Sequence, residues 1–178
     1  MTSSSTQTGL LPLHPTLLSI GYLVGFLSCV GLLAAAYYFE YVLYLDPCPL
    51  CIMQRIATLA IGLGCLAAFF TRNGKISHLI ALVFILASAI FGTWVADHHV
   101  WIQGLPADQV PSCGTSLEYM IETLPLNELI TTMLRGNGSC ADVVWSFWGL
   151  SMPEWTRIWF FGFVVAAVVA LASTLKRR

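Results

Sequence analysis

Apolar residues along the chain gather in four long runs that are separated by shorter polar stretches. The runs cover residues 17–39, 51–70, 79–96 and 158–175. Each run approaches or exceeds the ~20 residues that a helix needs to cross the hydrocarbon core of a bilayer. Backbone groups in lipid have no water to bond, so each run should be helical. The pattern predicts an all-α membrane protein, a four-helix transmembrane bundle.

The composition agrees with a chain that lies largely in lipid. Apolar residues make up 57% of the 178 residues and charged residues 10%, and the mean hydropathy is +0.78. A single membrane domain is expected over residues 17–175, after a Ser- and Thr-rich tail (1–16) and before a basic end (176–178). The tail lacks the charged region of a secretory signal, so the first run should stay uncleaved. No pattern typical of nucleic-acid binding is present.

Lys and Arg residues predict the orientation of the bundle. Arg72 and Lys75 lie between the second and third runs, and residues 176–178 close the chain. With four spans these regions share one side with the N-terminal tail, and the positive-inside rule assigns that side to the cytoplasm. The loops at about 40–50 and 97–157 then face outward. All nine Asp and Glu residues lie in or beside the segments assigned to the outer side.

The long second outer loop contains apolar residues at helical spacing. They are Leu117, Met120, Ile121 and Leu124, followed after Pro125 by Leu126, Leu129, Ile130 and Met133. This spacing predicts two short amphipathic helices of the kind that lie along a membrane surface.

The first outer loop ends in a C-x-x-C pair, Cys48 and Cys51, directly before the second run. One thiol of such a pair often has a lowered pKa, and the thiolate is the reactive species. A helix is expected to begin near Cys51, and its N-terminal dipole favours an anion there. Arg55 lies one helical turn further on, on the same face as Cys51. The arrangement indicates thiol redox chemistry.

The other cysteines divide by location. Cys29 and Cys65 fall inside apolar runs and are interpreted as packing residues. Cys113 and Cys140 lie in the second outer loop, and four outer cysteines permit three disulfide connectivities. Pairing within each loop is favoured, since each loop then closes on itself. The Cys113–Cys140 bond could be redox-active or a structural staple; the glycine-rich flanks favour a bond that moves between partners.

Two stretches resemble the DsbB family of bacterial disulfide formation proteins. Residues 47–52, Pro-Cys-Pro-Leu-Cys-Ile, followed by Arg55, are similar to the first outer loop of that family. Residues 145–155 resemble its Trp-x-Phe-Leu-Gly-Leu-x-Met-Pro-x-Trp signature, with Trp148 in place of the usual Leu. Gln54 stands where some members carry an acid. The resemblance extends from the first apolar run to the last.

The resemblance implies a multi-pass protein of the bacterial inner membrane, with cytoplasmic termini and periplasmic cysteine loops. It implies an oxidoreductase that reoxidises a periplasmic thioredoxin-fold dithiol oxidase (DsbA-like) by disulfide exchange. Two electrons would pass to a membrane quinone, ubiquinone or menaquinone. The sequence does not specify which quinone, which oxidase partner, the oligomeric state or the redox potentials.

The resemblance also assigns roles to the four outer cysteines. A thiolate of the reduced partner would attack Cys113 and form a mixed disulfide. Cys140 would leave and attack the C-x-x-C pair at Cys48. Cys51 would then be freed as a thiolate beside the quinone.

Three residues are predicted to bind the quinone. Arg55 is the first, since an ionisable residue inside a span is a functional candidate by default. His99 matches the family's spacing to Gln103, with His98 as the alternative. Met152 is the third, and it could wall the quinone ring together with Trp145. No metal is expected.

Other classes of protein remain as alternatives. The C-x-x-C pair with His98 and His99 could form a Cys2His2 metal site, although adjacent histidines rarely aim at one metal. A thiol-reducing enzyme resembling vitamin K epoxide reductase is a second alternative. In that family, however, the C-x-x-C pair lies late in the chain. A purely structural membrane protein is a third.

Overall fold

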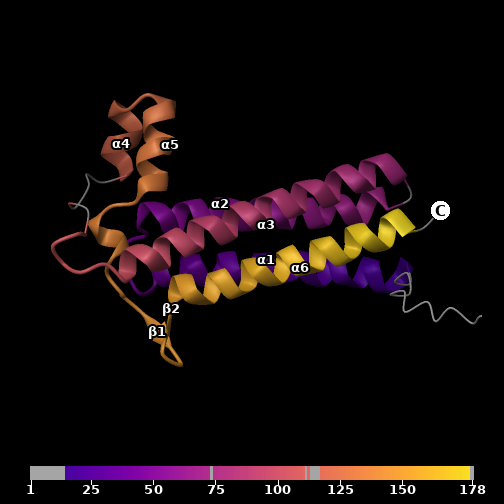
Figure 1. The fold of residues 1–178 in the computed structure, drawn as a ribbon, viewed down its shortest axis with the longest axis horizontal. Helices are drawn as coiled ribbons and strands as arrows, with labels where there is room; N and C mark the ends of the chain where they lie inside the picture. The colour runs from indigo at the N-terminus through magenta and orange to yellow at the C-terminus, as the bar shows by residue number, and fades with distance from the viewer. Residues whose placement is uncertain (1–14, 73, 111, 113–116, 177–178) are drawn as a thin grey trace, which may run out of the picture.

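The fold is a bundle of four long helices (Figure 1), described here from a computed structural model for residues 15–72, 74–110, 112 and 117–176. The helices are α1 (Pro15–Tyr41), α2 (Pro49–Thr71), α3 (Lys75–Gln103) and α6 (Met152–Lys176). All four are long and apolar enough to cross a membrane. Each predicted run lies within one helix and the helix continues past both of its ends, so the predicted all-α membrane fold is confirmed.

The loop between α3 and α6 carries the smaller elements. They are α4 (Leu117–Thr123), α5 (Leu126–Arg135), the 3-10 turn η1 (Gly138–Cys140) and the antiparallel strands β1 (Ser146–Phe147) and β2 (Leu150–Ser151). The two predicted amphipathic helices are α4 and α5. In Figure 1 they project sideways from the end of the bundle where α2 begins and α3 ends. The β-hairpin lies at the same end and leads into α6.

Close packing fixes the order of the helices. Helix α2 packs against α1 and α3, and α3 also packs against α6. At Gly92 of α3, a Cβ atom would lie 2.6 Å from the ring of Phe160 on α6. Helices in lipid associate through small residues of this kind, since they let two backbones approach. The α3–α6 contact therefore depends on glycine at position 92.

The outward faces of the long helices are apolar. Exposed side chains on α1 include Leu17, Ile20, Val24 and Leu27, and similar residues cover the other three helices. Exposed apolar surface on this scale indicates contact with lipid. The α2–α3 turn, with Arg72 and Lys75, lies at the same end as the C-terminal end of α6 (Figure 1), and the C-x-x-C pair lies at the opposite end.

Candidate thiol-exchange site

The start of α2 shapes the C-x-x-C pair. Helix α2 begins at Pro49, two residues earlier than expected, because proline suits the first helical position. Cys48 is the N-cap residue, and its Sγ accepts a hydrogen bond from the Cys51 N–H at 3.3 Å. The two Sγ atoms lie 2.9 Å apart, whereas a disulfide bond is about 2.05 Å long. Both residues are therefore free thiols in close contact.

The chain after α5 brings Cys140 back to this pair. Gly136 ends α5 with a φ of 71°, a left-handed conformation that favours glycine. A Cβ atom there would lie 2.9 Å from Ile102 Cδ1 and 3.0 Å from Leu50 Cδ1. The backbone thus passes directly over the ends of α2 and α3 and places Cys140 in a fully buried position. The glycines before Cys140 were interpreted as favouring a mobile disulfide. At Gly136 the absence of a side chain instead lets the backbone pack closely against Leu50 and Ile102.

Cys48 shares its proton with two other sulfurs. The Cys48 thiol donates a hydrogen bond to Cys140, which lowers the pKa of Cys140 from 9.0 to about 6 although burial acts in the opposite direction. The pKa of Cys48 is raised, chiefly because the sulfurs of Cys140 and Cys51 hold its proton. Cys48 therefore lies next to both Cys140 and Cys51, and the Cys140 thiol ionises more readily than an ordinary thiol.

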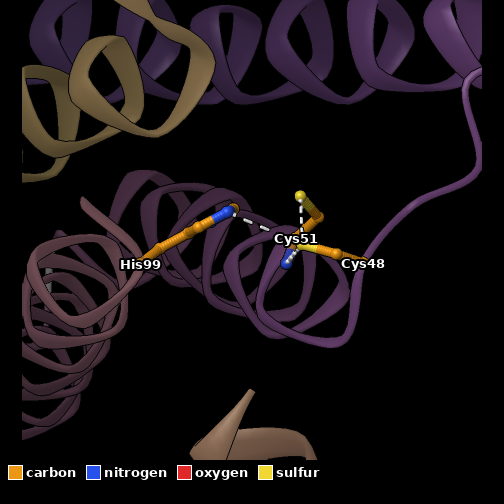
Figure 2. A group of neighbouring side chains, drawn as sticks. All are labelled: Cys48, Cys51 and His99. Atoms are coloured by element: carbon orange, nitrogen blue, oxygen red, sulfur yellow. Dashed lines mark hydrogen bonds between the residues drawn. The ribbon is translucent and has the colours of Figure 1, made fainter. Parts of the chain in front are cut away.

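His99 connects the sulfurs to three helices. Its ring is buried, and Nε2 lies 3.1 Å from the carbonyl oxygen of Cys140. The same nitrogen lies 3.7 Å from Cys48 Sγ (Figure 2). A carbonyl only accepts, so Nε2 carries the proton and Nδ1 accepts from the Gln54 side-chain amide at 3.1 Å. The Gln54 oxygen in turn accepts from the Thr156 hydroxyl at 2.7 Å. This chain of bonds holds the backbone of Cys140 in place.

Arg55, which was predicted to lie beside Cys51 and the quinone, forms its contacts with α1. Its guanidinium forms an ion pair with Glu40, donates to the carbonyl oxygen of Ala36 at 3.2 Å and lies over the ring of Tyr37 at 5.3 Å. The site predicted from the sequence did not include Glu40. Its position in the sequence offered a signal. Glu40 is the first acid in the chain and directly follows an apolar run, so it could be expected to pair with a cation such as Arg55 at the same end of the bundle.

An apolar cavity of about 380 Å³ opens beside Cys51. Arg55 and His99 line it, as do Met152 and Trp145, the predicted walls of a quinone site. The remaining wall is mainly aliphatic and aromatic side chains from α1, α6 and the adjoining loops, and α2 adds the polar Gln54 and Thr58. Volume and lining are typical of a small-molecule site with few, well-placed polar groups. The structure thus brings the three predicted binding residues to one cavity next to the C-x-x-C pair.

His98 lies away from the sulfurs. Its half-buried ring stacks between Trp94 and Trp101, and Nε2–H donates to the carbonyl oxygen of Arg135. The Cys2His2 set is therefore not assembled. In the described part of the chain, the C-x-x-C pair and His99 are the only metal-ligating group, with atoms within 4.8 Å of one another. Because Nε2 of His99 is protonated, no lone pair points from it toward the sulfurs.

Two of the remaining cysteines lie in the core of the bundle. Cys29 and Cys65 are buried among the apolar residues of the bundle, where the sequence placed them. Cys113 lies outside the described residues, and so does its expected pairing with Cys140.

Fold and site together define a class of protein: a four-helix membrane protein that carries adjacent thiols for disulfide exchange next to an apolar cavity. The family model for disulfide bond formation protein DsbB matches residues 19–170. The chain is 44% identical to disulfide bond formation protein B of Marinobacter nauticus, over 86% of this chain and 91% of that protein. Its identity to the protein of the same name from Hahella chejuensis is 46%, over 88% and 94%. The chain belongs to the DsbB family, whose members are disulfide-forming oxidoreductases.

Proposed function

We propose that this protein reoxidises a DsbA-like thioredoxin-fold dithiol oxidase and delivers the two electrons to a membrane quinone. One observation carries the proposal: the Cys48 sulfur contacts both Cys140 and Cys51, and Cys51 lines an apolar cavity. Three sulfurs in sequence are what successive thiol–disulfide exchanges need, because each step requires a nucleophile, an attacked sulfur and a leaving sulfur.

The exchange begins at the second outer loop. A thiolate of the reduced partner attacks Cys113 in a Cys113–Cys140 disulfide, and Cys140 leaves. Cys140 leaves as a thiolate next to Cys48, which places it for the following exchange. Cys140 then attacks Cys48 of the oxidised C-x-x-C pair, and Cys51 leaves toward the cavity. Burial of Cys48 and Cys140 excludes competing thiols from this step.

The cavity fits a quinone ring. A quinone supplies a two-electron, two-proton acceptor that dissolves in lipid. Arg55 provides a permanent cation and hydrogen-bond donor in the wall, while Met152 and Trp145 provide flat or flexible apolar contacts. His99 also reaches the cavity, but its Nε2–H is engaged by Cys140 and becomes available only when that loop moves. Ubiquinone and menaquinone both satisfy this lining.

A second groove supports a ligand with a long apolar tail. It occupies about 880 Å³ between α1 and α6 and consists almost entirely of apolar side chains. Trp155, Trp159 and Phe163 line both this groove and the cavity beside Cys51. The two spaces adjoin, so a ring near the sulfurs and a tail toward the bilayer centre can be held together.

The distribution of charge supports a place in the bacterial inner membrane. The cysteine end carries every acid of the chain, and the opposite end carries Arg72, Lys75 and residues 176–178. By the positive-inside rule the cysteine loops face the periplasm and both termini face the cytoplasm. A periplasmic oxidase could then reach Cys113.

The test is anaerobic mixing of the protein with a reduced thioredoxin-fold oxidase and a soluble quinone, followed by the quinone's absorbance. Wild type should consume quinone in proportion to the dithiol oxidised. Cys51→Ser should abolish quinone loss, since no thiol among the described residues then lines the cavity. Cys29→Ser, which changes a buried cysteine that lines neither the cavity nor the second groove, should retain it. Undiminished quinol production by Cys51→Ser would refute the mechanism.

A further inference from the structure

A cleft of about 550 Å³ lies at the end of the bundle opposite the cysteines. Its lining residues come from α1, from the end of α2 and the start of α3, and from the end of α6. Its polar rim includes Arg72, Lys75, Ser19 and Thr174. Its apolar wall includes Leu18, Ile20, Leu23 and Phe69. The cleft is therefore amphipathic, with cations at one edge and hydrocarbon along its length.

Contacts between helices hold the cationic edge in place. The Arg72 guanidinium donates to Ser19 Oγ at 2.7 Å and lies over the ring of Phe69 at 5.3 Å. The buried His78 also lines the cleft. Its Nε2 accepts from the Tyr22 hydroxyl at 3.1 Å, and its Nδ1–H donates to the carbonyl oxygen of Ala68 on α2. These bonds join α1, α2 and α3 around the cleft. A ligand would find the site already formed, which limits the ordering cost of binding.

The charge of this end is not balanced by the protein's acids. No Asp or Glu occurs in residues 1–39, 51–96 or 155–178. The two ion pairs found among the described residues are Arg55–Glu40 and Arg157–Asp97, both toward the cysteine end. Arg72 and Lys75 therefore lack a carboxylate partner in the described part of the chain. Basic pockets between transmembrane helices are a common way of holding anionic lipid headgroups.

We infer that this cleft binds an anionic phospholipid, with the phosphate between Arg72 and Lys75 and an acyl chain along the apolar wall. The wall favours a lipid over free phosphate, which would use the rim alone. Ile20 and Leu23, on this wall, are 54% and 48% exposed, so the wall is open to hydrocarbon. Occupancy would anchor this end of the bundle in one leaflet.

The experiment is native mass spectrometry of the full chain after exchange into micelles containing phosphatidylglycerol or phosphatidylcholine. Wild type should retain phosphatidylglycerol at least tenfold better than phosphatidylcholine. The double variant Arg72→Gln, Lys75→Gln should lose at least tenfold in phosphatidylglycerol retention. The matched control Arg135→Gln removes a cation at the opposite end of the bundle and should leave retention unchanged.

Three results would overturn the inference. They are equal retention by the double variant and the control, equal retention of the two lipids by wild type, and displacement of the lipid by millimolar inorganic phosphate, which would reassign the cleft to a free anion. Should the double variant fail to fold, Lys75→Gln carries the test. Its side chain is exposed, and it should lower retention about threefold; no change would contradict the inference.

Discussion

At the scale of single residues, the site depends on where one proton resides. Cys48 keeps its proton because two sulfurs accept from it, and Cys140 becomes a thiolate because it is one of those acceptors. The sequence indicated a reactive thiolate in the C-x-x-C motif, on the basis of helix dipole and Arg55. It carried no signal for a second thiolate at Cys140, since that depends on a contact between residues far apart in the chain.

The lowered pKa of Cys140 predicts a distinct pH dependence. In the reduced protein, the thiolate absorbance that disappears in Cys140→Ala should titrate near pH 6, well below the ordinary 9.0 of a thiol. Cys48→Ala removes the hydrogen-bond donor and should raise the midpoint toward 9.0. Cys48→Ser keeps a donor and should give an intermediate midpoint.

An unchanged midpoint in Cys48→Ala would contradict this account. It would mean that the backbone N–H groups near Cys140, and not the Cys48 thiol, hold the negative charge.

At the scale of elements, the long helices followed directly from the apolar runs, because hydropathy over some 20 residues leaves no other structure in lipid. Helix α2 begins two residues before the predicted start at Cys51, because Pro49 is the first helical residue and Cys48 is the N-cap. The return of the chain through Gly136 to η1 was not predictable. It depends on space left above Leu50 and Ile102, which exists only in the folded bundle.

The α3–α6 contact predicts a position-specific effect of adding one methyl group. Gly92→Ala should destabilise the bundle by about 1–3 kcal/mol, because the new Cβ would overlap the buried Phe160 ring. Gly162→Ala is the matched control: it lies in α6, and an added Cβ there would meet no atom within 4 Å. It should leave stability unchanged or raise it by about 0.5–1 kcal/mol. Thermal unfolding in detergent measures both. Equal midpoints for the two variants would argue against close packing at Gly92.

At the scale of the whole molecule, one line of hydrogen bonds joins the four parts that build the site. Thr156 on α6, Gln54 on α2 and His99 on α3 lead to the carbonyl oxygen of Cys140 in η1. His99 was predicted as a quinone contact from the family's spacing, and it does line the cavity. Its bond to Cys140 was not predictable, because no local pattern in the sequence relates positions 99 and 140. The histidine therefore links the sulfur exchange to the cavity.

This link predicts that Gln54 acts as a positioning residue for the attack of Cys140 on Cys48. Gln54→Leu removes the donor to Nδ1 of His99, so the ring can rotate and release Cys140. An unsatisfied buried group costs about 1–3 kcal/mol, which corresponds to a loss in rate of roughly 5- to 150-fold. Gln54→Glu should restore the rate, since a doubly protonated His99 can donate to both the carboxylate and the Cys140 carbonyl. Gln54 also lines the cavity, so the step is measured without quinone. Rapid mixing with reduced oxidase then follows electron flow to the C-x-x-C pair alone. Equal slowing by the leucine and glutamate variants would show that Gln54 only fills space.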